Sequence, residues 1–296
     1  MRDDGVVSGS VSGGCVEDDL IARTKASFIS AGGRTPALEK PAMIAYGVSQ
    51  EDAARFGLPC GGTLRLVQEP LLDTTWVAQL LARTAAHQLV ARTLNLATGA
   101  VRLLDAMRGQ AVQFDGSTLT TVFGPKWRLL LIGAGQLSQA VAQMAVMLDF
   151  EVLVCDPREE YAATLGAGMH GMSGVRRLEG MPDDVVRELV PDAHTAIVAL
   201  THDPKLDDMA LLEALQSSAF YVGALGSRRN QNVRKQRLAE HFGLSAEELA
   251  RLRGPVGLAL GAKTPAEIAV SILAEIVQVK NVVVDTAKQK VRRQSQ

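Results

Sequence analysis

Two of the three cysteines in the chain lie beside a pair of glycines, as Gly13-Gly14-Cys15 and Cys60-Gly61-Gly62. Because glycine adopts turns that other residues avoid, a thiol in such a turn is expected to be accessible, whereas most free cysteines are buried. An accessible thiolate suits a thiophilic metal or a persulfide. Cys15 and Cys60 are therefore candidate reactive thiols and candidate metal contacts, and the alternative is that each is a small turn residue.

The third cysteine and the spacing of all three argue against several kinds of cysteine site. Cys155 ends the apolar run Val152-Leu153-Val154-Cys155 and is predicted to be a core residue of a strand. The sequence has no Cys-x-x-Cys pair for a structural zinc site, and no histidine lies near Cys15 or Cys60 in sequence to activate either thiol. Three cysteines do not make a disulfide framework, so the chain is expected to be a cytoplasmic protein in a reducing compartment.

A second candidate site is the glycine-rich turn Gly133-Ala134-Gly135-Gln136-Leu137-Ser138, which follows an apolar run at 128–132 and opens a predicted helix at 139–148. Gly133 would make the tight turn and Gly135 would let a phosphate approach the backbone, while the helix N-terminus supplies unpaired N–H groups. Asp156 ends the next predicted strand, where a ribose-binding acid belongs. Ser138 occupies the third position of this fingerprint. The turn predicts a phosphate-bearing ligand, of which a nicotinamide nucleotide is one possibility.

Three further segments follow predicted strands or precede a helix: Thr201-His202-Asp203-Pro204, Gly226-Ser227-Arg228-Arg229-Asn230 and Gly261-Ala262-Lys263-Thr264-Pro265. Open α/β sheets bind ligands at the carboxyl ends of their strands. These segments would bring an imidazole, a carboxylate, guanidinium groups and an ammonium to a polar, anionic ligand. The candidate contacts are His202, Asp203, Ser227, Arg228 and Lys263, and the alternative is ordinary turn chemistry.

The elements that must position these residues change character near Gly124-Pro125. Before it, helices are predicted at 18–29 and 75–86, and strands at 43–46, 63–67, 90–96 and 101–104. After it, strands at 128–132, 151–155, 195–200 and 219–222 alternate with helices, which is typical of a parallel sheet. Capping boxes at Ser245–Glu248 and Thr264–Glu267 mark helix starts, and Ile268, Ile272, Ile276 and Val279 form one apolar stripe.

The sequence thus predicts an α/β protein with two domains. Residues 1–124 would form a smaller mixed α+β domain, and residues 125–296 a Rossmann-like, doubly wound parallel sheet.

Composition excludes several function classes. The chain has 296 residues and a formal net charge of −1, which gives no electrostatic reason to expect nucleic acid or an acidic membrane surface as a partner. No apolar run approaches the length that spans a bilayer, and the acidic start lacks the apolar stretch of a signal peptide.

Several of these motifs together resemble the XdhC/CoxI family, the accessory proteins that mature xanthine dehydrogenase and related molybdenum hydroxylases. In the first domain the resemblance rests on Gly9-Ser10-Val11-Ser12-Gly13-Gly14-Cys15-Val16-Glu17, Cys60-Gly61-Gly62 and Glu69-Pro70. In the second it rests on the Gly133 turn, Asp156-Pro157-Arg158, Thr201–Pro204, Gly226–Arg229 and Gly261–Ile268. The chain begins close to the cysteine turn, so its first domain is expected to be shorter at its start than in other members.

The resemblance implies a chaperone that binds the molybdenum cofactor, or molybdopterin, and shields it while a cysteine desulfurase replaces a Mo=O oxygen with sulfur. The mature cofactor would then pass to apo-xanthine dehydrogenase or a related molybdenum hydroxylase. The glycine turn would hold the phosphate of this anionic cofactor, and Cys15 or Cys60 would contact molybdenum or relay sulfur. Such a protein is a maturation factor rather than a turnover enzyme, and a homodimer is possible.

Two other functions are weighed beside it. An NAD(P)-dependent oxidoreductase would use Gly133, Gly135 and Asp156 to bind the nucleotide, with His202 as its proton-transfer group. A non-catalytic scaffold between a desulfurase and its target enzyme would bind no small molecule. A pair of domains with a cleft favours a ligand site over a pure scaffold.

Overall fold

The computed structural model describes residues 1–2, 5–11, 14–30, 39–47, 63–107, 109–158 and 174–294, without the side chains of 27–30 and 285–294. Two compact units make up the chain, and each is described by itself. The first comprises Met1–Ala106 and Ala111–Phe123, and the second comprises Met107–Gln110 and Gly124–Gln296. The domains 1–124 and 125–296 stay a prediction.

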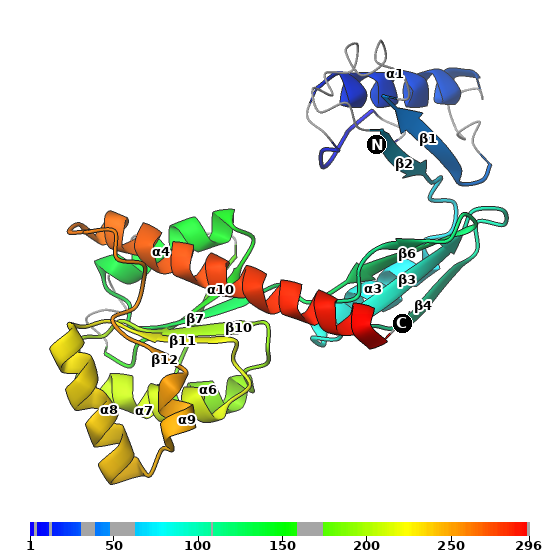
Figure 1. Ribbon diagram of the computed structural model, residues 1–296. Coiled ribbons are helices and arrows are strands. Elements are labelled where there is room, and N and C mark those ends of the chain that lie inside the picture. Colours follow the sequence, from blue (N-terminus) through cyan, green and yellow to red (C-terminus); the bar gives the residue numbers. More distant parts are fainter. Residues whose placement is uncertain are drawn as a thin grey trace. The chain divides into compact units, whose positions relative to one another are not determined.

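The second unit contains a six-stranded sheet in the order β12-β11-β10-β7-β8-β9 (Figure 1). Its strands are β7 (Arg128–Ile132), β8 (Glu151–Cys155), β9 (Val175–Leu178), β10 (Thr195–Ala199), β11 (Tyr221–Ala224) and β12 (Leu252–Arg253). All five neighbouring pairs are parallel. Numbered along the chain, this is the doubly wound order of the Rossmann fold, in which the order reverses between β7 and β10. The predicted fold class is confirmed.

Helices cover both faces of this sheet, because its central strands are apolar on both sides. Leu129 and Leu131 pack with α4 (Gln136–Met147) and α10 (Pro265–Gln294). Leu130 and Ile132 pack into the opposite layer. That layer is formed by α6 (Pro182–Leu189), α7 (Pro204–Gln216), α8 (Arg228–Phe242) and α9 (Ala246–Ala250) (Figure 1).

The predicted apolar stripe of α10 is confirmed. Ile272 and Ile276 are fully buried, and Ile268 and Val279 pack against the same core cluster. Both predicted capping boxes also form. The Ser245 hydroxyl accepts from the Glu248 N–H and Glu248 accepts from the Ser245 N–H, and Thr264 and Glu267 make the equivalent pair. The starts of α9 and α10 are therefore encoded locally.

The first unit contains α1 (Cys15–Ser30), a hairpin of β1 (Ala42–Tyr46) and β2 (Leu64–Gln68), and α3 (Thr75–Ala85). A four-stranded antiparallel sheet follows, in the order β4-β3-β6-β5. Its strands are β3 (Val90–Asn95), β4 (Val101–Asp105), β5 (Gln113–Phe114) and β6 (Thr118–Phe123). The strands predicted from 43 to 104 are confirmed within one residue at each end. Sequence patterns missed β5, β6, β9 and β12, since these strands are short or lack a continuous apolar run.

A buried cation joins the Glu69-Pro70 motif to the four-stranded sheet. Arg92 on β3 is 5% exposed and forms an ion pair with Glu69. Its guanidinium also lies 4.2 Å from the centre of the Trp76 ring on α3. Because a buried arginine needs charge compensation, the half-buried Glu69 is held against β3 by this ion pair.

Candidate functional site

The glycine turn after β7 lies where the strand order reverses, which is the position at which doubly wound sheets bind ligands. Gly133 has a φ of 108°, and its N–H donates to the Cys155 carbonyl (2.7 Å). A Cβ atom at Gly133 would lie 3.1 Å from the backbone of Leu200 and Thr201, at the end of β10. Gly133 is therefore required by both conformation and space, and the turn packs directly against the next strand of the sheet.

The N-terminus of α4 differs from the other helix starts at this edge of the sheet. Gly135 is its N-cap residue and makes no side-chain capping bond, and no described atom lies within 4 Å of a Cβ built there. By contrast, α7 is capped by Asp203 and α8 by Ser227. The first N–H groups of α4 are thus left for a ligand, and the helix dipole favours a negative one.

Ser138, in the first turn of α4, is 1% exposed. Its hydroxyl is buried without a hydrogen-bond partner among the described residues. A buried polar atom of this kind usually finds a water or a ligand. Ser138 shares the buried face of α4 with Val141, Ala142 and Ala145, which fits the small residue that packs the helix on the sheet at the third position of the fingerprint.

Asp156, which follows β8, is 2% exposed, and neighbouring groups of the protein hydrogen-bond to its carboxylate. One carboxylate oxygen accepts from the Ala134 N–H (2.9 Å), and the Arg158 guanidinium donates to both oxygens (2.8 Å each). Burial raises the pKa of Asp156, but the hydrogen bonds from Arg158 and from the Ala134 N–H outweigh it, so the pKa lies below its ordinary value of 3.8. In this arrangement Asp156 holds the glycine turn in place.

Asp156→Asn should therefore lower stability in a pH-dependent way. A carboxyl whose pKa is depressed by folding stabilises the protein fully above its ordinary pKa, and this contribution is lost as the pH falls through the folded pKa. We expect a loss of about 1–3 kcal/mol at pH 7, narrowing as the pH falls below 3.8. Urea denaturation from pH 7 to pH 3 measures it, with the exposed Asp149→Asn as control. A difference that is constant with pH would contradict the prediction.

The segment after β10 places a histidine at the same edge. Thr201 is buried, His202 is exposed, and the side chain of Asp203 accepts from the Lys205 N–H at the start of α7 (2.9 Å). His202 has a φ of 63°, a left-handed conformation that is uncommon for residues other than glycine. Asp203 is thus a helix cap, and His202 is the side chain of this segment that is open to a ligand.

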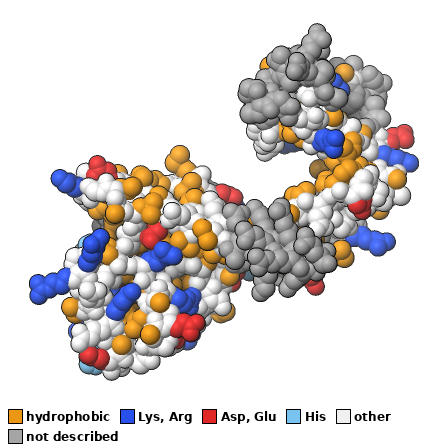
Figure 2. Space-filling view, in the orientation of Figure 1, with side chains coloured by type: hydrophobic (Ala, Val, Ile, Leu, Met, Phe, Trp, Pro, Cys, Tyr) orange, Lys and Arg blue, Asp and Glu red, His pale blue; other side chains and the backbone are white. Residues whose placement is uncertain are grey.

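The remaining candidates also follow strands at this edge. The Ser227 hydroxyl accepts from the Asn230 N–H (3.2 Å) and so caps α8, while Arg228 next to it is exposed. Lys263 is exposed, and its N–H donates to the capping carboxylate of Glu267 (2.8 Å). Arg228 and Lys263 are therefore cations available to an anion, and Ser227 has a structural part. On the face shown in Figure 2, Lys and Arg side chains are scattered over the second unit rather than gathered in one patch.

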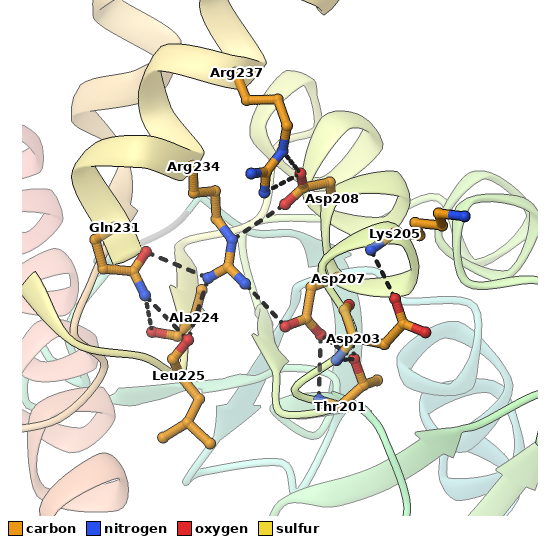
Figure 3. A network of polar contacts seen from close by, with 10 residues as sticks. All are labelled: Thr201, Asp203, Lys205, Asp207, Asp208, Ala224, Leu225, Gln231, Arg234 and Arg237. Carbon is orange, nitrogen blue, oxygen red and sulfur yellow. Dashed lines mark hydrogen bonds and ion pairs between the residues drawn. The ribbon is translucent and has the colours of Figure 1, made fainter. Parts of the chain in front are cut away.

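Sequence reasoning missed a polar network beneath this edge (Figure 3). Its charged members are Asp207 and Asp208 on α7 and Arg234 and Arg237 on α8. Gln231, 2% exposed, joins them by donating to the Ala224 and Leu225 carbonyls (3.0 and 3.1 Å). Because these residues are charged and far apart in sequence, the sequence alone predicts that they face solvent on their helices. They belong to no recognisable motif.

The two candidate thiols belong to the first unit. Cys15 is exposed, as predicted, and is the first residue of α1, preceded by Gly14 with a φ of 136°. Cys60 lies outside the described residues. Cys155 is fully buried in β8, which confirms its predicted place in the core. Among the described residues, no group of three or more His, Cys, Asp or Glu side chains could hold a metal ion.

A cavity of 340 Å³ adjoins the segment that leads to Cys15. The segment up to Val11 lines one side, and α1, β1 and β2 line the rest with mostly apolar side chains beside the polar Glu17, Thr24 and Gln68. The Glu17 carboxylate accepts from the Ser10 hydroxyl (2.7 Å) and from the Val11 N–H (2.8 Å). Glu17 thereby fixes this segment against the start of α1.

Fold and site together define a class: a Rossmann-fold protein with an uncapped helix N-terminus at the point where its strand order reverses. A family model described as the XdhC Rossmann domain matches residues 129–276, half of the chain. The chain belongs to the XdhC family. In the residues that the structure describes, no helix is long and apolar enough to cross a membrane.

Three relatives illustrate the match. The molybdenum cofactor insertion chaperone PaoD of Escherichia coli is 28% identical over 282 residues, covering 95% of this chain and 76% of PaoD. A Bacillus subtilis protein named as a probable subunit of xanthine dehydrogenase is 27% identical, covering 92% of this chain and 84% of its own length. The Escherichia coli protein YqeB, named as uncharacterized, is 35% identical over 173 residues, and the match spans only 29% of its length.

A solved structure shares the fold. The crystal structure of a protein named as a xanthine dehydrogenase from Bacillus halodurans matches with a TM-score of 0.71 and 23% identity. The match covers 95% of this chain and 85% of that one, so it includes both units.

Proposed function

We propose that this chain holds the molybdenum cofactor as cargo for insertion into a molybdenum hydroxylase such as xanthine dehydrogenase. The observation that carries the proposal is the Gly133 turn, where α4 begins without a side-chain cap and the space over Gly135 is open. Membership of the XdhC family and the 95% coverage by a relative named as a cofactor insertion chaperone support it. The chain would act as a maturation factor rather than as a turnover enzyme.

In this proposal the phosphate of the cofactor lies against the N-terminus of α4. Gly133 and Gly135 shape the turn, Ser138 supplies a hydroxyl, and exposed Arg228 and Lys263 add positive charge. Asp156 keeps the turn in position through the Ala134 N–H, and His202 contacts the cargo at the end of β10. Asp203 and Ser227 hold the starts of the neighbouring helices.

The two candidate thiols would act at the molybdenum atom of the cofactor. We propose that Cys15 or Cys60 contacts molybdenum, or relays sulfur from a cysteine desulfurase during sulfuration of the cofactor. The exposure of Cys15 at a glycine turn supports this for one of the two. The same proposal includes a cytoplasmic location, where these partners would act, and a homodimer.

An NAD(P)-dependent oxidoreductase is less well supported. Its nucleotide would need Asp156 to bind the ribose hydroxyls, yet both carboxylate oxygens already accept from Arg158 and one also accepts from Ala134. A change in NADH fluorescence on adding the protein would favour this alternative.

The test is the molybdenum and pterin content of the protein after anaerobic purification from a host that makes the cofactor. We expect near-stoichiometric molybdenum with an oxidisable pterin. Absence of both, even after incubation with supplied cofactor, would overturn the proposal.

Cys15→Ala and Cys60→Ala then test the thiols. We expect molybdenum content to fall about tenfold or more in the variant that lacks the metal contact, because a metal–thiolate bond is lost. Cys155→Ala is the matched control, since its thiol is buried in the core. Unchanged molybdenum in both variants and in the double variant would remove thiol ligation from the proposal.

A further inference from the structure

Arg234 is a buried cation placed beneath the ligand edge of the sheet. It is 7% exposed and projects from α8 toward α7 (Figure 3). Its guanidinium pairs with Asp207 (3.0 Å) and with Asp208 (3.1 Å), and Asp208 also pairs with Arg237. The negative and positive charges therefore balance within the cluster, as burial demands.

On one side the cluster reaches the segment after β10. One Asp207 oxygen accepts from the Thr201 N–H (3.2 Å) and from the Thr201 hydroxyl (2.7 Å), while the other accepts from Arg234. The Thr201 hydroxyl also accepts from the Asp203 N–H (3.0 Å). His202 is thus held in its left-handed conformation by bonds on both of its neighbours, and such strain persists only where the surroundings fix it.

On the other side the cluster reaches the turn after β11. Arg234 donates to the Leu225 carbonyl (3.2 Å) and to the side-chain oxygen of Gln231 (3.3 Å). Gln231 in turn donates to the Ala224 and Leu225 carbonyls. This turn leads through Gly226 and Ser227 to the exposed Arg228.

Stability alone does not account for such an arrangement. Buried ion pairs are often no more stabilising than apolar residues of similar volume, and their directional bonds fix one geometry instead. Arg234 is bonded directly to the turn after β11 and, through Asp207, to the segment after β10. Thr201 in turn lies against Gly133, so the same chain of contacts extends to the phosphate-binding turn.

We propose that Arg234 is a positioning residue that sets His202 and Arg228 in register with the Gly133 turn, so that the three bind one anionic ligand together. The inference rests on the proposed function, because the ligand is the cargo of that site.

The experiment compares Arg234→Gln with Arg128→Gln. Arg128 is also 7% exposed and bonds to Thr195 (3.2 Å) and Asp192 (3.4 Å), but it lies at the opposite, amino end of β7. The probe is molybdenum cofactor released anaerobically from a purified molybdenum hydroxylase, and its dissociation constant is measured alongside hydrogen exchange of the peptides containing Thr201 and Leu225. Arg234→Lys, which keeps the charge, is made in case the glutamine variant does not fold.

We expect the Arg234 variants to bind the cofactor about tenfold more weakly or worse, with faster exchange at both peptides. Arg128→Gln should lose comparable stability while keeping slow exchange there and unchanged affinity. Unchanged affinity in a folded Arg234 variant would overturn the inference, as would an equal loss in Arg128→Gln. If the wild type itself binds no cofactor, the proposed function fails. The positioning role is tested independently of binding, because hydrogen exchange that stays slow in the Arg234 variants would reject it.

Discussion

Gly133→Ala should lose both stability and cofactor. The residue has a φ of 108°, and its added Cβ atom would lie 3.1 Å from the backbone of Leu200 and Thr201, which cannot move as a side chain could. Left-handed backbone costs an alanine about 1–2 kcal/mol, and overpacking adds about 1–3 kcal/mol. We therefore expect a loss of about 2–5 kcal/mol in the free energy of unfolding, measured by urea denaturation.

Gly135→Ala is the matched variant that separates binding from folding. Gly135 has a φ of −74° and open space around its Cβ position, so we expect a stability change of about 1 kcal/mol or less. The new methyl group would nevertheless occupy the space where the phosphate approaches, and molybdenum content should fall sharply. If Gly135→Ala retained as much cofactor as the wild type, the phosphate would not lie against this turn. A Gly133→Ala protein of normal stability would contradict the steric argument.

The second large effect is expected at Glu275, a glutamate on α10 that is 9% exposed. Its carboxylate accepts from the Tyr221 hydroxyl (2.6 Å) and the Gly257 N–H (2.7 Å) and pairs with Arg253 (3.4 Å). Burial and this carboxylate raise the pKa of Tyr221, so its hydroxyl remains a donor. Glu275→Ala would leave these donors without an acceptor, at a cost of about 2–4 kcal/mol.

Thermal and urea denaturation measure this loss, and a double-mutant cycle with Tyr221→Phe isolates the hydroxyl–carboxylate bond. We expect Tyr221→Phe to cost less than Glu275→Ala, because phenylalanine removes one donor and leaves the acceptor with Gly257 and Arg253. Additive losses in the double variant would mean that the two side chains do not interact.

The sheet of the second unit could be predicted from sequence because its central strands are continuous apolar runs. Arg128–Ile132 and Glu151–Cys155 were bounded correctly, since burial on both faces leaves no polar position in the middle of the strand. The edge strand β9 contains two arginines and β12 has two residues, so neither shows such a run. Burial did not fix every boundary, since the fully buried β11 begins and ends two residues later than the predicted strand at 219–222.

The site was predictable only where backbone geometry decides it. The turn at Gly133 could be predicted because its positive φ favours glycine, and a glycine after a strand is visible in the sequence. The bond between Asp156 and Arg158 could not be predicted, because it depends on the side chain of Arg158 turning back onto its neighbour. The Arg234 cluster could not be predicted, since its ion pairs join residues 26 to 29 positions apart that meet only after α7 and α8 pack on the sheet.

The bare start of α4 has a consequence for selectivity. Main-chain N–H groups recognise the charge and shape of a phosphate, whichever molecule carries it. Free nucleotides and inorganic phosphate would therefore compete with the cargo at this turn. Discrimination among them has to come from side chains around it, of which His202, Arg228 and Lys263 are exposed. A chaperone built in this way would distinguish its cargo from other phosphate compounds by the part of the cargo that does not contact the glycine turn.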